Sequence, residues 1–167
     1  MLHSSFPPLY QESTEILVLG SMPGQVSLDA QQYYANRQNL FWSFVFACPR
    51  AELPNCYDQR IKVLFDRHIG LWDVLKHCHR EGSLDSAISR SSEVANDLEV
   101  LVQSMPRLKR LCFNGKKARQ LFDRHILKAG SFPVARYELV DLPSTSPANA
   151  AMSFETKALR WRQALSI

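Results

Sequence analysis

The stretch that decides the fold is Glu15-Ile-Leu-Val-Leu-Gly20-Ser-Met-Pro-Gly24. Its first half is a short, continuous apolar run that ends at glycine, which is typical of a strand buried on both faces in a parallel sheet. Similar runs occur at 110–113 and 137–142. We therefore predict three buried strands, with ligands approached through the loops at their carboxyl ends.

Segments with helical periodicity alternate with these runs. Side chains recur at three-to-four spacing in two stripes. The first contains Tyr57, Ile61, Leu64, Phe65 and His68, and the second contains Ala118, Leu121, Phe122 and Ile126. A third stripe consists of Phe154, Ala158, Trp161 and Leu165. Ser153 is placed to cap that helix, and Glu155 lies in its first turn. This alternation predicts a three-layer α/β fold.

Size and composition restrict the class of protein. A chain of 167 residues is typical of one domain, and we expect a single domain over 1–167 with an N-terminal extension over 1–14. Hydrophobic residues make up 46% and charged residues 22%, and no apolar run approaches the roughly 20 residues that span a bilayer. The segment 1–8 does not resemble a secretory signal, so we expect a soluble, intracellular protein. The net charge of +4 permits a polyanionic partner without requiring one.

The spacing of the cysteines and histidines gives no metal pattern. Cys48, Cys56, Cys78 and Cys112 contain no close pair, which argues against an iron–sulfur cluster and favours free thiols. The segment His77-Cys-His79 lacks the second ligand pair of a structural zinc site. We therefore expect no metal and no cofactor.

The loop Gly20-Ser-Met-Pro-Gly24 is the first candidate for chemistry. Its two glycines permit unusual φ values and a close backbone approach to a phosphate or a base. It is neither a Walker loop, because no Gly-Lys-Ser/Thr follows, nor a G-x-G-x-x-G fingerprint. A plain turn after a strand is the alternative interpretation.

A second candidate segment, 27–42, is dense in amide and aromatic side chains. Amides can read the polar edge of a base or hold a water molecule, and aromatic rings can stack on bases. The alternative is the buried start of a helix. We assign Trp42 to the core and leave Phe41 open between core and base stacking. Asn39 is open between a functional amide and a helix cap.

The third loop, Leu142-Pro-Ser-Thr-Ser-Pro-Ala-Asn-Ala150, lies between the last predicted strand and the last helix. Its serines can bind phosphates, although a polar turn has the same composition. Because the first and last predicted strands both end in loops with Ser and Pro, we expect the two loops to converge on one cleft. Asn114 ends the 110–113 strand and is open between a ligand contact and an Asn-Gly turn.

Seven segments together resemble the hypoxanthine-DNA glycosylases, also called DNA-deoxyinosine glycosylases, within the uracil-DNA glycosylase superfamily. The resemblance spans residues 15–165, and no single segment is diagnostic. The segments are Gly20-Ser-Met-Pro-Gly24, Tyr33-Tyr34, Asn39-x-Phe-Trp42, Leu71-Trp-Asp-Val74, Glu81-Gly-Ser-Leu-Asp85, Phe113-Asn-Gly-Lys-Lys-Ala118 and Leu142-Pro-Ser-Thr-Ser-Pro147. The resemblance implies a four-stranded parallel sheet between helices, with a pocket for an extruded base.

The resemblance also implies roles for individual residues. Related uracil enzymes place Asn or Asp where this chain has Met22, and in the hypoxanthine group the catalytic role falls to the amide that corresponds to Asn39. Pro147 is the candidate that would fill the vacated base stack. The substrate-binding set is Gly20, Ser21, Met22, Pro23, Gly24, Phe41 and Asn114, and the DNA-binding set is Ser144, Ser146 and Pro147.

The implied activity is that of a monofunctional DNA glycosylase, acting as a monomer on DNA that contains a deaminated base. It would hydrolyse the N-glycosidic bond of deoxyinosine and release hypoxanthine after flipping the base out of the stack. Two alternatives stay open: a glycosylase specific for uracil or mismatches, and a module that binds damaged DNA without turnover.

Overall fold

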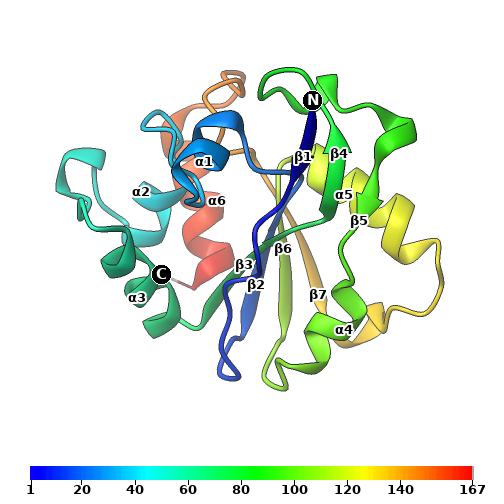
Figure 1. Cartoon of the computed structure of the whole chain (residues 1–167). Coiled ribbons are helices and arrows are strands. Elements are labelled where there is room, and N and C mark those ends of the chain that lie inside the picture. Colours follow the sequence, from blue (N-terminus) through cyan, green and yellow to red (C-terminus); the bar gives the residue numbers. More distant parts are fainter. Residues whose placement is uncertain (167) are drawn as a thin grey trace.

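A central sheet of four parallel strands organises the molecule (Figure 1). The computed structural model describes residues 1–166. The strand order is β3 (Ile69–Asp73), β2 (Ile16–Gly20), β6 (Arg110–Asn114) and β7 (Glu138–Leu142). The register pairs Gly20 with Asp73 and Asn114 with Leu142, so the carboxyl ends of all four strands finish at one edge. The predicted α/β fold with a four-stranded parallel sheet is confirmed.

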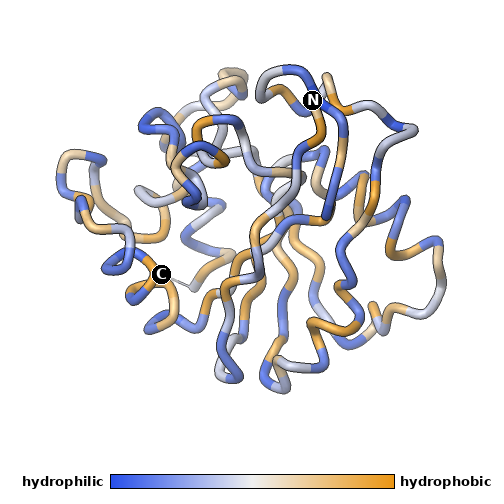
Figure 2. Tube along the Cα trace, viewed as in Figure 1, coloured by the Kyte–Doolittle hydropathy of each residue, from blue (hydrophilic) through white to orange (hydrophobic). Residues whose placement is uncertain are grey.

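Helices cover both faces of this sheet. On one side lie α1 (Gln25–Ala30), α2 (Phe41–Phe46), α3 (Tyr57–Asp66) and α6 (Phe154–Leu165), and on the other lie α4 (Leu98–Gln103) and α5 (Lys116–Phe122) (Figure 1). Alternate residues of β2 enter different cores: Ile16 and Val18 pack with α2, α3 and α6, whereas Leu17 and Leu19 pack with α4 and α5. Burial on both faces explains the continuous apolar run, which is visible in Figure 2.

A second, smaller sheet lies beside the α4 and α5 layer. It contains β1 (Leu2–Ser4), β4 (Leu75–His79) and β5 (Val94–Ala95) in antiparallel pairing. Leu2–Ser4 was predicted to be part of an extension, but it pairs along β4 and is integral to this sheet. The remaining short turns of helix are Arg50–Glu52, Asp85–Ala87, Arg90–Ser92, Asp123–Leu127 and Val134–Arg136. Within residues 1–166, no helix combines the length and apolarity needed to cross a bilayer.

The predicted helices form, with two corrections to their stripes. The Ser153 side chain accepts from the Thr156 N–H at 3.2 Å, so the predicted cap of α6 is confirmed. Phe154, however, is 48% exposed. His68 lies outside α3, because it adopts a φ of 56° and turns the chain into β3. The residue patterns did not identify β3 as a strand, since it begins directly after the last residue of the predicted stripe and only two residues separate it from the end of α3.

Candidate active site

A cavity of about 470 Å³ lies over the carboxyl ends of the four parallel strands. Its volume falls in the range of roughly 300–1,000 Å³ that is usual for ligand pockets. The residues that line it come from every strand end: Gly20–Gly24, Val26, Ser27, Tyr33, Tyr34, Asn36, Asn39, Asp73, Ser83–Asp85, Asn114 and Ser144–Asn149. The first and third candidate loops therefore meet at one cleft, as expected from the sequence.

The loop Gly20–Gly24 forms one wall and is held from beneath by a buried arginine. Arg80 is only 2% exposed and donates to the carbonyl oxygen of Pro23 at 2.5 Å and to that of Met22 at 3.5 Å. Met22 lines the cavity with an apolar side chain that is 5% exposed, so it supplies no group that handles water. The structure thus makes this loop a rigid, mostly apolar wall.

A neighbouring segment after β4 completes this side of the cavity. The Ser21 hydroxyl donates to Asp85 at 2.6 Å, and the Gln25 N–H donates to the Ser83 hydroxyl at 2.9 Å. Between these two anchors, Leu84 stands at the rim with 57% of its surface exposed. The segment thus presents a leucine to solvent at the mouth of the cavity.

Asn39 also lines the cavity and lies two positions before the first residue of α2. Its Oδ1 accepts from the Phe41 N–H at 2.9 Å, and the Leu40 N–H donates to the Thr145 carbonyl at 3.0 Å. The first contact satisfies a backbone donor at the start of the helix, but the N-cap position is Leu40, so the capping interpretation of Asn39 is corrected to a turn hydrogen bond from the residue before the cap. The same hydrogen bond restrains the amide in the cavity lining, so this contact is compatible with a functional role.

Phe41 does not line the cavity. It is fully buried, and its ring stacks on that of Tyr34 with 4.1 Å between centroids. Tyr34 does line the cavity and adopts a φ of 55°. The predicted direct contact between Phe41 and a base is therefore corrected: Phe41 belongs to the core, where large aromatic rings bury the most area, and it backs the ring of Tyr34. Trp42 is also buried, as predicted.

Asn114 lines the cavity, but its amide is occupied by other protein groups. Its Oδ1 accepts from the Thr145 N–H at 2.9 Å, while Nδ2 donates to the Tyr34 hydroxyl at 3.0 Å and to the Thr145 hydroxyl at 2.9 Å. These contacts use both amide hydrogens, so Asn114 connects the third loop to Tyr34. Next to it, Gly115 has a φ of 94°, and a Cβ there would lie 3.0 Å from that of Ser144.

The third loop presents hydroxyl groups along the cavity. The Ser144 hydroxyl oxygen accepts from the Ser146 N–H at 3.2 Å, and that of Ser146 accepts from the Ala148 N–H at 3.3 Å. In both contacts the oxygen accepts, which leaves the hydroxyl protons available as donors. Pro147 is exposed at the rim. The buried Lys157 holds the far end of the loop by donating to the Asn149 carbonyl.

Two carboxyl groups in the cavity wall were missed in the assignment of site residues. Asp73 ends β3 and Asp85 follows β4, and both line the cavity. Burial raises the pKa of Asp85, although the hydrogen bond from Ser21 opposes that change. The signal for Asp73 was present in the sequence, because an aspartate ends the apolar run Ile69–Trp72.

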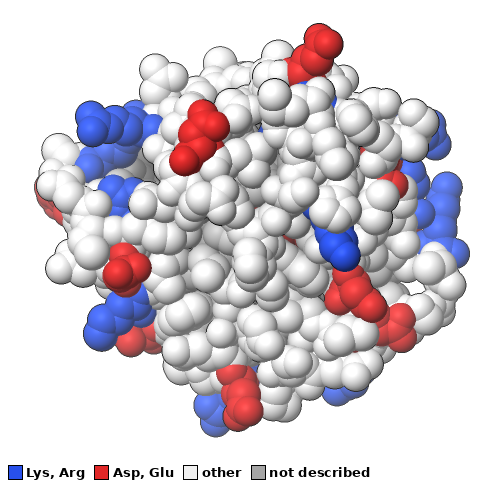
Figure 3. Space-filling model, viewed as in Figure 1, with Lys and Arg blue, Asp and Glu red and all other residues white. Residues whose placement is uncertain are grey.

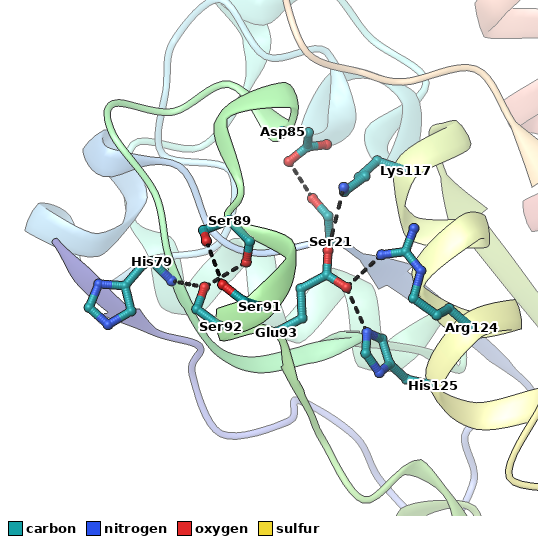
Figure 4. Close-up of polar contacts among 10 residues, drawn as sticks. All are labelled: Ser21, His79, Asp85, Ser89, Ser91, Ser92, Glu93, Lys117, Arg124 and His125. Atoms are coloured by element: carbon teal, nitrogen blue, oxygen red, sulfur yellow. Dashed lines mark hydrogen bonds and ion pairs between the residues drawn. The ribbon is translucent and has the colours of Figure 1, made fainter.

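A charged cluster lies next to this wall (Figure 4). The Glu93 side chain is fully buried and contacts Arg124 at 2.6 Å, His125 at 2.7 Å and Lys117 at 3.7 Å. Burial alone would raise the pKa of Glu93, but the hydrogen bonds from His125 and Arg124 outweigh it and lower the pKa overall. The cluster ties the segment before β5 to the α5 side of the sheet.

Charge on the viewed face is dispersed. Figure 3 shows basic side chains gathered mainly at the flanks of this face, with acidic side chains among them. No continuous basic stripe crosses the face that Figure 3 shows.

Comparison with known proteins places the chain in a family. The model of the uracil DNA glycosylase superfamily matches residues 7–165. A hypoxanthine DNA glycosylase of Methanosarcina acetivorans is 40% identical over 154 residues, with 92% of each chain covered. A hypoxanthine DNA glycosylase of Methanosarcina barkeri is 38% identical over 165 residues, with 98% of each covered.

A solved structure agrees with this assignment. The chain superposes with a TM-score of 0.79 and 37% identity on the solution NMR structure of a candidate uracil DNA glycosylase from Methanosarcina acetivorans, covering 99% of this chain and 97% of the other. The fold and the matched length therefore agree over nearly the whole of both chains. The chain therefore belongs to the uracil DNA glycosylase superfamily.

Proposed function

We propose that the protein is a monofunctional DNA glycosylase that hydrolyses the N-glycosidic bond of deoxyinosine and releases hypoxanthine. The observation that carries the proposal is a cavity at the strand ends with the Asn39 amide fixed in its wall. The two relatives named hypoxanthine DNA glycosylase, similar over nearly the whole chain, support this choice of substrate.

The cavity implies that the base leaves the duplex before it reacts. A base inside the stack cannot reach groups at the strand ends, so the nucleotide must be extruded at a cost of about a few kcal/mol. Deaminated adenine pairs poorly with thymine, which lowers this cost. The hydroxyl groups of Ser144 and Ser146 can donate to phosphates that flank the extruded nucleotide.

Asn39 is the proposed catalytic residue. The Phe41 N–H occupies one lone pair of Oδ1 and orients the amide, whose remaining groups can position the attacking water or stabilise the positive charge that develops on the sugar. Since the hydrogen bond exists before the substrate binds, the amide needs no reorganisation during the reaction. Met22 and Phe41 take no part in the chemistry.

The rim offers two side chains that can fill the vacated base stack. Pro147 lies on the third loop, and Leu84 lies on the segment after β4. Apolar wedges of this kind partly unstack neighbouring bases and keep the duplex open. Leu84 is the larger of the two and is 57% exposed, so we assign it the wedge role ahead of Pro147.

A base-release panel tests the proposal. Duplexes with a single deoxyinosine, a single deoxyuridine or neither are incubated with the protein, and free bases are measured by mass spectrometry alongside alkali-labile strand breaks. Hypoxanthine and matching abasic sites are expected from the inosine duplex. Release of uracil alone would favour the uracil-removing alternative, whereas binding without base release would favour the non-catalytic one.

We propose that the protein acts as a monomer, because a single chain supplies the residues that line the cavity. We also propose that its substrate is intracellular DNA. Light scattering of the protein with and without an inosine duplex tests the first part. A dimer required for base release would contradict it.

A further inference from the structure

The base pocket contains a buried carboxyl group that the mechanism above does not use. Asp73 is 3% exposed, ends β3 and lies in register with Gly20 of β2. Its Oδ1 lies 2.6 Å from the position that a Cβ at residue 20 would occupy, so only glycine at that position lets the carboxyl pack against the strand end. Its Oδ2 is buried and has no hydrogen-bond partner within residues 1–166.

The charged groups around Asp73 do not neutralise it. Arg80 directs its guanidinium to the Pro23 and Met22 carbonyls, and Asp85 accepts from Ser21. Tyr33 and Tyr34 approach from the segment before α2, and burial raises the pKa of both hydroxyls, so they remain neutral.

The resulting pKa of Asp73 is close to neutral. Burial raises it from 3.8 to about 7, and the charge of Asp85 acts in the same direction, while the Tyr33 hydroxyl and the Arg80 charge oppose the rise. A carboxyl buried without a salt-bridge partner follows this pattern, since desolvation disfavours its charged form. Asp73 is therefore largely un-ionised in slightly acidic solution and titrates near neutrality.

A neutral carboxylic acid has the hydrogen-bonding groups that match a deaminated purine. It offers one O–H donor and one carbonyl acceptor, whereas a carboxylate only accepts. The Watson–Crick edge of hypoxanthine presents an oxygen acceptor at position 6 beside an N–H donor at position 1. A carboxylic acid can satisfy both, while a carboxylate would repel the oxygen.

On this basis, and resting on the proposed function, we infer that Asp73 binds the O6 and N1–H edge of the flipped base as a neutral carboxylic acid and stabilises it as a leaving group. When the bond between C1′ and N9 breaks, both electrons go to the base, and the negative charge is delocalised toward O6. The carboxyl O–H donates to that oxygen and keeps its proton. A buried donor aimed at developing charge lowers the barrier of the chemical step.

The test is the pH dependence of single-turnover hypoxanthine release between pH 5 and 9. In the wild-type protein the rate is expected to fall as Asp73 ionises near pH 7. Asp73→Asn offers the same donor and acceptor without titrating, so it should keep the rate at pH 6 within about tenfold and lose the alkaline fall. Asp73→Ala should lower the rate at pH 6 by roughly 10²-fold, and this deficit should shrink at alkaline pH, where the wild type has also lost the O–H donor. Asp97→Asn, an exposed change at the cap of α4, should keep the wild-type profile.

Thermal melting of the free protein against pH gives a readout independent of activity. Because the pKa is raised, the native state between about pH 4 and 7 keeps a proton that the unfolded state has lost. The stability of the wild type relative to Asp73→Asn should therefore be greatest below about pH 4 and should decline as the pH rises through 7. A folded Asp73→Asn variant as inactive as Asp73→Ala, or one that keeps the alkaline fall, would overturn the inference while base release by the wild type stands. If the wild type releases no hypoxanthine at any pH, the proposed function fails whatever the melting curves show.

Discussion

Replacing Asn39 with alanine is expected to have two consequences of very different size, a small loss of stability and a large loss of catalytic rate. The first is the hydrogen bond from the Phe41 N–H at the start of α2, and losing such a hydrogen bond costs about 1 kcal/mol of stability. For a chain of this length that lowers the melting temperature by roughly 2–4 °C. A domain with a stability of about 5 kcal/mol or more would still be over about 99% folded. Unfolding therefore cannot produce a large loss of rate.

The second effect is catalytic. If the amide orients water or stabilises the developing cation, Asn39→Ala should lower the single-turnover rate of hypoxanthine release by roughly 10²-fold or more, which corresponds to about 2.7 kcal/mol. Affinity for inosine DNA should change much less, because the interaction is strongest in the transition state.

A matched control separates the two effects. Asp97 caps α4 by accepting from the Val100 N–H at 3.1 Å, and it does not line the cavity. Asp97→Ala should therefore lower the melting temperature by a similar amount with a near-normal rate. A folded Asn39→Ala variant that behaves like Asp97→Ala in both assays would refute the catalytic assignment and leave Asn39 only its hydrogen bond at the start of α2.

Three further outcomes are expected. Leu84→Ala should slow hypoxanthine release from duplex inosine DNA by about tenfold and from single-stranded inosine DNA less. Leu159→Ala, which changes an equally exposed leucine on α6, should alter neither rate. If the two variants changed the rates on duplex and single-stranded DNA equally, the wedge role would be contradicted. Glu93→Gln should reduce the free energy of unfolding at pH 7 by roughly 1.5–3 kcal/mol, the value of a hydrogen bond to a charged group. Because the pKa of Glu93 is lowered, this difference should shrink as the pH falls through that pKa, in thermal melts followed by circular dichroism. A difference that stays constant down to pH 3 would contradict this prediction. No lysine is among the described residues that line the cavity, so borohydride should trap no covalent adduct with DNA, and a trapped band on a denaturing gel would show that the chemistry is not purely hydrolytic.

Local patterns in the sequence predicted three of the four strands of the parallel sheet and the helices α3, α5 and α6. The apolar runs that became β2, β6 and β7 are continuous because parallel strands are buried on both faces. Ser153 indicated the start of α6, since a cap depends on residues three positions apart. The loops after the first and last predicted strands also identified both sides of the cavity, because carboxyl ends of parallel strands share an edge.

The tertiary structure decided which polar groups face the cavity and which are already paired. Asn39 and Asn114 both carry amides and both lie in segments that line the cavity. The Asn114 amide forms hydrogen bonds with Tyr34 and Thr145, which belong to distant segments. The Asn39 amide instead accepts a hydrogen bond from the start of the helix that follows it. Partners 31 and 80 positions away leave no periodic signal in the sequence.

The same reason explains Asp73 and Phe41. Parallel pairing of β2 with β3 places Asp73 beside Gly20, although 53 positions separate them, and long-range packing buries the carboxyl there. Phe41 has the composition of a stacking residue, but packing of α2 against the sheet buries its ring behind Tyr34. Residue type and spacing thus determined the fold and the loops of the site, whereas long-range packing decided the environment of each side chain and hence its chemistry.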